Sequence, residues 1–237
     1  LHEQNAIAGM SNRILGRLAR RICLSLPGTE GFDASRTVLT GNPVRAAVVA
    51  LAGRQHDFSG KRLLVMGGSL GAHALNVHVC RHLDALRAAG IEVRHQTGVR
   101  DEAVTREAYA AAGYDPACVS AFIDDMASAY AWADLVLCRA GATTVAELCA
   151  AGLPSVLVPF PYAVHDHQTR NAQALVAEGA ALMLPEARME SDGLMAQVTD
   201  LLQDTGRLRT MAAAASGCAR VRAAELVAAE LETVCAR

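Results

Sequence analysis

The chemistry that this chain can carry is concentrated in a short loop and the helix after it, beyond the middle of the sequence. Residues 134–138 form an apolar run typical of a buried strand, and a turn of small residues follows. A helical pattern then covers residues 143–151, with Thr143, Thr144 and Glu147 in its opening turns. The start of a helix presents unpaired N–H groups and the positive end of the helix dipole, which attract phosphate. A carboxylate one turn further along can reach the hydroxyls of an attached sugar, although the same pattern also suits a capped strand–helix unit in any parallel sheet.

A glycine turn at residues 67–71 offers a second place where a diphosphate could approach the backbone. It lies between the apolar run 63–66 and the helical pattern 72–89, and Ser69 adds a hydroxyl. The turn lacks the G-x-G-x-x-G spacing of dinucleotide-binding loops, and no acid follows the next predicted strand, residues 91–96. The lysine-bearing phosphate loop of NTPases is also absent from the sequence. The turn is therefore a weak NAD signature, but it suits a diphosphate.

The sequence shows no clear ligand set for a metal ion or a cofactor. It has no D-x-D motif or other carboxylate pair spaced to hold a divalent ion. His165, Asp166 and His167 are adjacent, but three adjacent side chains rarely converge on one ion. The seven cysteines include no C-x-x-C pair and no Cys/His cluster at metal spacing. We therefore expect a binding site without metal and without cofactor.

Composition excludes several classes of protein. Hydrophobic residues make up 52% of the 237 residues and charged residues 19%, so the chain can bury a large core and is not disordered. A net charge of -2 argues against nucleic acid as a partner, because nucleic-acid binding demands a concentrated basic face. Scattered cysteines inside apolar runs indicate reduced thiols and a cytoplasmic protein. The longest apolar stretch, residues 153–164, is interrupted by three prolines and does not suit a membrane span.

Strand and helix patterns alternate regularly from Arg62 onward, which predicts an α/β fold with a Rossmann-like parallel sheet covered on both faces. Ligands of such sheets bind beyond the carboxyl ends of the strands, where both small-residue turns lie. The predicted strands cover residues 63–66, 91–96, 117–122, 134–138, 155–159 and 181–184. The predicted helices cover residues 72–89, 101–112, 124–133, 143–151 and 167–178, with further Ala/Leu-rich helices to the end of the chain.

The N-terminal part reads as the tail of another domain. We assign residues 1–53 to that tail, 54–61 to a polar linker and 62–237 to a C-terminal domain whose last helices return to the first domain. Within the tail, a helix is predicted at residues 9–22, strands at 22–26 and 37–40, and a further helix at 44–52. The polar tetrad that follows Leu1 resembles the end of a buried strand. We therefore expect a fragment whose first 52 residues are too short to form a sheet of their own and are loosely held.

Six motifs follow one another along the chain: LHEQNAIAGMSNR (1–13), GNPVR (41–45), MGGSLGAHALN (66–76), FIDDMASAYAWADLVLCRAGATTVAEL (122–148), GLPSVLVPFP (152–161) and DHQTRNA (166–172). Their order and spacing closely resemble the MurG family of bacterial N-acetylglucosaminyltransferases over nearly the full length. The resemblance implies a GT-B fold, in which two Rossmann-like domains face a cleft and the C-terminal domain holds most of the sugar nucleotide. It also implies the transfer of GlcNAc from UDP-GlcNAc to lipid I (undecaprenyl-pyrophosphoryl-MurNAc-pentapeptide), with inversion at the anomeric carbon. The product would be lipid II, a precursor in peptidoglycan synthesis.

The same resemblance implies contacts for the donor, UDP-GlcNAc. Asn5 and Gln168 are expected to contact the GlcNAc, and Arg45 and Ser69 to lie near the diphosphate. The backbone of Ile123 is expected to bind uracil. The loop and helix start supply amides and hydroxyls to the diphosphate and the carboxylate of Glu147 to the ribose, through Ala142, Thr143, Thr144, Val145, Ala146 and Glu147. His167 replaces a glutamine found in relatives, and the sequence gives it no role.

The resemblance further implies a preceding domain that binds lipid I, carries the catalytic base and faces the membrane. No catalytic residue can therefore be named within this sequence, and we expect UDP-GlcNAc binding without transfer. The expected location is the cytoplasmic face of the bacterial inner membrane, as a peripheral protein. Departure of UDP leaves negative charge on the β-phosphate, which helix-terminal amides and one guanidinium can neutralise without a metal.

Two other classes of protein remain open at this point. One is another GT-B enzyme, such as a nucleotide-sugar epimerase or a different lipid-linked glycosyltransferase. The other is a non-catalytic nucleotide-binding module or a dehydrogenase domain. The HEQN and DHQTRNA motifs argue against the first class, and the imperfect glycine spacing at residues 67–71 argues against the second.

Overall fold

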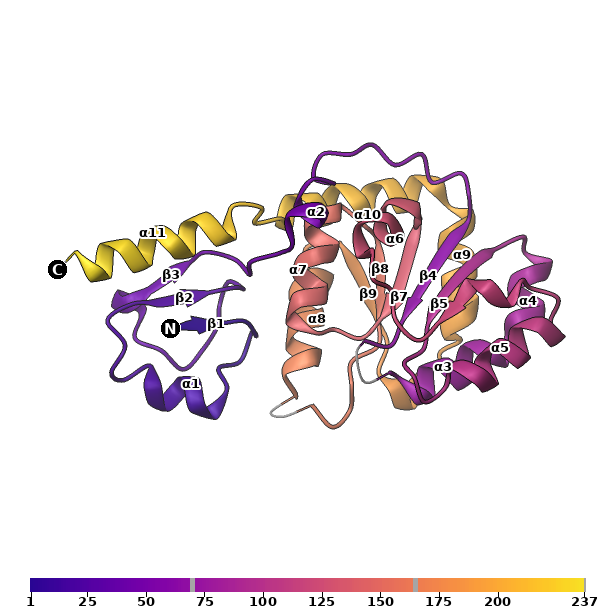
Figure 1. The fold of residues 1–237 in the computed structure, drawn as a ribbon, viewed down its shortest axis with the longest axis horizontal. Helices are drawn as coiled ribbons and strands as arrows, with labels where there is room; N and C mark the ends of the chain where they lie inside the picture. Colours follow the sequence, from indigo (N-terminus) through magenta and orange to yellow (C-terminus); the bar gives the residue numbers. More distant parts are fainter. Residues whose placement is uncertain (69–70, 164–165, 237) are drawn as a thin grey trace.

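The chain folds into a small lobe that contains the N-terminus and a larger α/β lobe (Figure 1). The computed structural model describes residues 1–68, 71–163 and 166–236. Within these ranges, no helix combines the length and the apolar character needed to cross a membrane.

The large lobe is built on a six-stranded sheet in which every neighbouring pair is parallel. Strand order is β6-β5-β4-β7-β8-β9, so the chain moves outward from β4 in one direction and then outward from β7 in the other. The carboxyl ends of β4 and β7 therefore flank the point where the order reverses, which is where open α/β sheets bind ligands. The strands are β4 Arg62–Met66, β5 Glu92–Gln96, β6 Val119–Ser120, β7 Leu135–Cys138, β8 Ser155–Leu157 and β9 Ala181–Met183.

Helices cover both faces of this sheet, as the alternating pattern predicts. Leu63 and Val65 of β4 face an apolar core with α3, α4, α5, α9 and α10, whereas Leu64 and Met66 face a second core with α2, α6, α7 and α8. Successive residues of a strand point to opposite faces, so one buried run serves both cores. The helices are α2 Ala46–Val49, α3 His73–Cys80, α4 Leu83–Ala88, α5 Glu102–Ala111, α6 Met126–Trp132, α7 Ala142–Ala151, α8 His167–Ala177, α9 Leu194–Gln203 and α10 Thr205–Cys218, with the short 3₁₀ helices η2 Pro116–Cys118 and η4 Glu186–Arg188.

The small lobe contains a sheet, so the expectation that residues 1–52 cannot form one is wrong. Strands β1 (His2–Glu3), β2 (Ile22–Leu24) and β3 (Thr37–Leu39) pair in parallel in that order. The buried carboxylate of Glu3 organises the turn after β1, because it accepts hydrogen bonds from the backbone N–H groups of Asn5 (2.9 Å) and Gly9 (3.0 Å). Three short strands are sufficient to form a sheet because α11 (Ala223–Cys235) packs alongside them. Arg21 pairs there with Glu230 of α11 at 2.7 Å.

Two predicted helices differ from the observed ones. The helix expected at residues 9–22 is α1, Met10–Leu15, and it ends at Gly16, where the ring of Phe32 occupies the space of a Cβ. The helix expected at residues 72–89 is divided into α3 and α4. The break has a local cause at His82. Its backbone N–H donates to the Val79 carbonyl (3.0 Å), three residues back, and its ring Nδ1 donates to the His78 carbonyl (2.9 Å), which an α-helix would bond to the backbone of residue 82.

The chain crosses between the lobes twice. The first crossing follows β3 and leads to α2, and the second joins α10 to α11. The two crossings touch at Gly41, whose φ is +85°, and a Cβ there would overlap the side chain of Arg220. Glycine is therefore required at this position by both conformation and space.

A buried polar network behind the glycine turn fixes the end of β5 against α3. The Nδ2 of Asn76 donates to the Thr97 carbonyl, which fixes the orientation of the amide and leaves its Oδ1 as an acceptor. The Nε2–H of His95 therefore donates to this Oδ1 at 3.0 Å. The hydroxyl of Tyr109 donates to the other His95 nitrogen at 3.0 Å. A Cβ on Gly71 would lie 2.6 Å from the same Thr97 carbonyl oxygen, so the network determines how closely the turn packs on β5.

Acid is expected to destabilise the fold through His95. Burial lowers the pKa of His95 from 6.5 to about 3 in the folded chain, so the unfolded chain binds the proton more readily between these values. The contribution is fully present above pH 6.5 and is lost as pH falls towards 3, by about 2 kcal/mol between pH 6.5 and 5. Urea unfolding of the wild type and of His95→Gln at pH 7.5 and 5.0 measures it. Equal losses of stability in the two proteins would contradict this assignment.

Candidate functional site

The start of α7 lies open at the carboxyl end of β7, next to the point where the strand order reverses. Gly141 occupies the N-cap with an extended backbone (φ -66°, ψ 145°), and in the described part of the chain no side chain caps the helix. The amides of Ala142, Thr143 and Thr144 precede the first backbone hydrogen bond of the helix, from Val145 N to Gly141 O at 2.9 Å. Thr143 is exposed and Thr144 half-buried, so amides and hydroxyls are presented together. A helix start of this kind, with its amides unpaired, is suited to binding an anion.

Glu147 lies one turn further along α7, with its side chain only 5% exposed. Its Oε2 accepts a hydrogen bond from the hydroxyl of Tyr130 at 2.9 Å. Its Oε1 is buried and has no hydrogen-bond partner among the described residues. The nearest cation is Arg45, whose Nε lies 3.4 Å from Oε1 and whose side chain is 61% exposed. A buried carboxylate oxygen without a donor is unusual, and it is a ready acceptor for a ligand hydroxyl.

Tyr130 keeps its proton at neutral pH. Burial and the neighbouring Glu147 raise the pKa of its phenol well above the ordinary value. The hydroxyl therefore donates to Oε2 at all physiological pH values, which leaves Oε1, without a hydrogen-bond donor, to accept from a ligand.

Asn171 of α8 connects this region to the small lobe. Its Oδ1 accepts a hydrogen bond from the backbone of Ala6 at 2.9 Å, and its Nδ2 donates to Asn5 Oδ1 at 3.1 Å and to the Ala140 carbonyl at 3.2 Å. Asn5 is thereby held beside the loop that opens α7. Gln168 lies one turn before Asn171 and accepts from the N–H of Phe160 at 2.9 Å.

The loop after β7 is supported from β8 by Arg139. Its Nη1 donates to the carbonyls of Val158 (3.1 Å) and Pro159 (3.2 Å), and its Nη2 pairs with Glu186. The guanidinium also lies over the ring of Phe160, 5.5 Å from its centroid. Arg139 is therefore committed to structure and does not present a free charge to a ligand.

Gln96, at the end of β5, joins the glycine turn to the loop that carries Ile123. Its Oε1 accepts from Gly68 N (3.0 Å), and its Nε2 donates to the carbonyls of Gly68 (3.1 Å) and Ala121 (2.7 Å). Ile123 lines a groove of about 720 Å³ along the β6 side of the sheet. Ser69 lies outside the described residues.

A cavity of about 240 Å³ separates the two lobes beneath the start of α7. Its walls come from the small lobe through Ser25 and Pro27, and from α7 through Ala142, Val145 and Ala146. Three of the predicted site residues, Ala142, Val145 and Ala146, thus line this cavity, and with apolar side chains they can contact an anion at the helix start only through the backbone.

The glycosyltransferase family 28 C-terminal domain matches residues 62–227. The chain belongs to glycosyltransferase family 28. A relative from Nitratidesulfovibrio vulgaris (strain Hildenborough), named UDP-N-acetylglucosamine–N-acetylmuramyl-(pentapeptide) pyrophosphoryl-undecaprenol N-acetylglucosamine transferase, is 52% identical over 96% of this chain. The chain spans 63% of the length of that relative. The resemblance to the MurG family is thereby confirmed.

Solved structures agree with this family 28 membership. The crystal structure of Acinetobacter baumannii MurG superposes with a TM-score of 0.79 at 38% identity, covering 98% of this chain and 66% of that one. A putative UDP-N-acetylglucosamine 2-epimerase from Listeria monocytogenes shares the fold alone, with a TM-score of 0.61 at 16% identity over 94% of this chain and 62% of that one. The chain contains the C-terminal domain of a GT-B glycosyltransferase, as its sequence predicts.

Three residues of the site region were not singled out from the sequence. Tyr130 and Asn171 lie within motifs that carried the family resemblance, and Asn171 follows Gln168 by three positions, which places both on one helix face. This spacing could have identified Asn171 from the sequence as a residue near the site. Gln96 offered none, because a glutamine at the end of a strand is common and its two partners are distant in sequence.

Proposed function

We propose that this chain provides the donor side of an inverting glycosyltransferase that moves GlcNAc from UDP-GlcNAc to lipid I, producing lipid II for peptidoglycan. The observation that carries the proposal is the Oε1 of Glu147, which is buried one turn behind the open start of α7, has no hydrogen-bond partner among the described residues and is ion-paired with the mostly exposed Arg45. A diphosphate on the helix amides would place its attached sugar within reach of that oxygen. The names of the relatives support GlcNAc as the transferred group and a lipid-linked muramyl pentapeptide as the acceptor.

In this proposal each element has a distinct role. The amides of residues 142–144 and the hydroxyls of Thr143 and Thr144 bind the diphosphate, while Glu147 accepts from the ribose. Arg45, mostly exposed beside Glu147, turns from the carboxylate towards the phosphates when the nucleotide enters. Ser69 is assigned to the diphosphate from the sequence pattern alone.

The GlcNAc and the uracil bind at opposite ends of the same site. Asn5 and Gln168 contact the GlcNAc from the two sides of the junction between the lobes, which Asn171 holds together. The backbone of Ile123 binds uracil. This arrangement puts the anomeric carbon between the lobes, where an acceptor hydroxyl can approach from the face opposite UDP.

Transfer is helped by stabilising the charge that develops on the leaving group. As the bond from the anomeric carbon to the β-phosphate oxygen breaks, negative charge accumulates on that phosphate. The helix-start amides are fixed and need no reorganisation at the moment of reaction, and the Arg45 guanidinium would add a positive charge once it has turned to the phosphates. The acceptor hydroxyl bonds to the anomeric carbon and loses its proton to a base that the site described above does not assign.

We further propose that the enzyme works as a peripheral protein at the cytoplasmic face of the inner membrane. The support is chemical, since an undecaprenol-linked acceptor of the kind named for the relatives remains in a lipid bilayer while UDP-GlcNAc is water-soluble. Flotation of the protein with anionic vesicles that contain an undecaprenyl lipid tests this location.

Nucleotide binding is the direct test of the proposed function. Because a ligand that binds only the folded chain stabilises it by mass action, UDP at about one hundred times its dissociation constant should raise the Tm by roughly 5–10 °C. UDP-GlcNAc should bind more tightly than UDP-glucose, and NADH should produce no shift. A shift with NADH and none with UDP would contradict the proposal and favour a dehydrogenase-type module.

An epimerase is distinguished by incubating the chain with UDP-GlcNAc alone. We expect the nucleotide sugar to be recovered unchanged, because transfer requires an acceptor. Conversion into a second UDP-sugar, detected by chromatography, would favour the epimerase alternative that the shared fold leaves open.

A further inference from the structure

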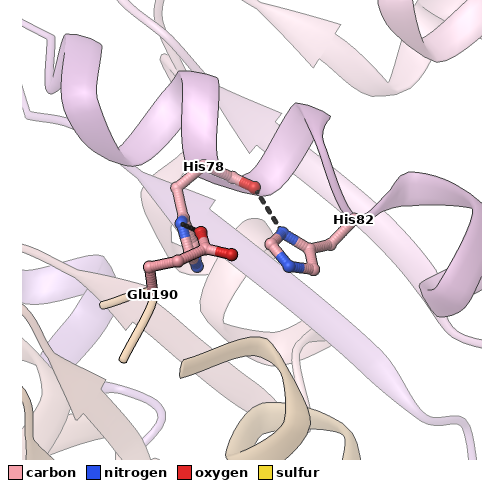
Figure 2. Close-up of side chains that lie close together, drawn as sticks. All are labelled: His78, His82 and Glu190. Atoms are coloured by element: carbon pink, nitrogen blue, oxygen red, sulfur yellow. Dashed lines mark hydrogen bonds and ion pairs between the residues drawn. The ribbon is translucent and has the colours of Figure 1, made fainter. Parts of the chain in front are cut away.

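Two histidines and a glutamate form a compact cluster on the large lobe. Figure 2 shows the side chains of His78, His82 and Glu190 converging from the end of α3 and from the segment between η4 and α9. One ligand atom from each residue lies within 4.8 Å of the other two. Ligands of a single ion at 2.0–2.2 Å are roughly 3–4 Å apart, so a small side-chain rotation brings all three to one ion.

The cluster is separate from the proposed nucleotide site. Helix α3 begins just after the glycine turn at the carboxyl edge of the sheet and runs back towards the opposite edge, so His78 and His82 lie at its far end. Glu190 belongs to the turn before α9, which packs on the same face of the sheet as α3.

The two histidines are pre-arranged for metal binding. His78 lies in the last turn of α3 and His82 in the turn that joins α3 to α4, and the centroids of their rings are 4.7 Å apart. The carbonyl of His78 can only accept, so the Nδ1 of His82 donates to it at 2.9 Å. In neutral His82 this hydrogen bond fixes the tautomer and leaves the Nε2 lone pair free, as the supporting hydrogen bonds of metal-binding histidines do.

His78 and Glu190 supply the other two ligands. His78 is buried, and its Nδ1 lies 3.4 Å from Glu190 Oε2, while its Nε2 has no hydrogen-bond partner among the described residues. The imidazole is therefore not part of a completed hydrogen-bond network. The side chain of Glu190 is 74% exposed and free to adjust.

The cluster opens into a groove that can admit an ion and its water. The groove has a volume of about 350 Å³ and contains all three residues. Thr199 and Asp200 of α9 add polar groups to its wall. An ion in this groove would connect the end of α3 to the segment before α9.

We propose that His78, His82 and Glu190 form a binding site for Zn²⁺, with two imidazole nitrogens and one carboxylate oxygen as protein ligands and water at the fourth position. Two nitrogens with one carboxylate suit Zn²⁺ better than Mg²⁺ or Ca²⁺, which prefer oxygen ligands. The site would stabilise the large lobe and take no part in sugar transfer. The sequence does not indicate this site, because Glu190 is far from the two histidines along the chain.

Calorimetric titration of the reduced 237-residue chain with Zn²⁺ tests the site. We expect one ion per chain at this cluster and a rise in Tm of about 5 °C at saturating Zn²⁺. His82→Ala and Glu190→Gln should each weaken binding at least tenfold. His73→Ala, on the same helix but outside the cluster, is the matched control and should bind Zn²⁺ as the wild type does. UDP binding should be unchanged in the two cluster variants.

Cobalt absorption separates this site from the seven cysteines of the chain. Co²⁺ on nitrogen and oxygen ligands shows only weak visible bands, whereas a thiolate ligand adds an intense charge-transfer band. Such a band, or Zn²⁺ affinity unchanged in Glu190→Gln, or no measurable binding, would overturn the proposal. Glu190→Gln is decisive if His82→Ala fails to fold, since an exposed side chain is altered without loss of packing.

Discussion

Replacing Glu147 by glutamine is expected to weaken UDP binding by about tenfold or more while leaving the protein folded. The carboxylate accepts the Tyr130 hydroxyl through one oxygen and keeps the other without a donor, in a position that a ribose hydroxyl can occupy. Hydrogen bonds to a charged acceptor contribute about 1.5–3 kcal/mol, which corresponds to the expected loss. Glutamine keeps the shape but offers one acceptor oxygen in place of two. Calorimetric titration with UDP measures the change.

Two further variants separate binding from folding at this position. Tyr130→Phe removes only the donor that holds Oε2, so it should weaken UDP binding less than Glu147→Gln does. Glu232→Gln, on exposed α11, should leave affinity unchanged. A folded Glu147→Gln protein with wild-type affinity for UDP would show that this acid is an ordinary helix residue.

Replacing Asn171 by alanine should destabilise the protein by about 3 kcal/mol and loosen the contact between the lobes. The side chain is fully buried and satisfies the Ala6 amide, the Ala140 carbonyl and the Asn5 amide oxygen. Each buried group left without its partner costs about 1–3 kcal/mol, and part of this is recovered where water enters. Urea unfolding measures the stability, and limited proteolysis measures exposure of the small lobe.

Gln173→Ala is the matched control, because Gln173 is exposed on the same helix. It should retain both stability and resistance to protease. Asn171→Ala with unchanged stability would mean that the lobes are held by apolar packing alone, and Asn5 would then lose the support that places it beside the α7 loop.

The large lobe follows from local patterns, which explains how well its strands could be predicted. The apolar run at residues 135–138 lies between the polar residues Asp134 and Arg139, and a short run of this kind has few alternatives to a buried strand. The observed β7, Leu135–Cys138, differs from the prediction by one residue. Strand order could not be read in the same way, because it depends on how helices pack over the sheet.

The strands of the small lobe were predicted, at residues 22–26 and 37–40 and after Leu1, but the sheet that they form was not, because its stability is non-local. Strands β1–β3 contribute only two or three residues each. They are supported by α11, about two hundred residues later in the chain, and by the buried Glu3 carboxylate. A buried glutamate in a polar tetrad looks like a surface residue in a sequence, and only its backbone partners identify its role.

The distinction between local patterns and contacts between distant segments also applies to the site. Thr143, Thr144 and Glu147 could be proposed from one helix start, since their relation is fixed by helical geometry. The contacts between Asn5, Asn171 and Ala140 join segments from three parts of the chain. Such contacts follow from the family resemblance at best, and hydrogen-bond detail such as the free Oε1 of Glu147 follows only from the structure.

The meeting of the two crossings at Gly41 and Arg220 has a mechanical consequence. The space for a side chain at position 41 is filled by Arg220, so the two crossings are packed against each other without a gap. A larger residue at position 41 would push the crossings apart, and this displacement would be passed to the cavity that both lobes line, because Asn42 and Arg220 belong to its wall.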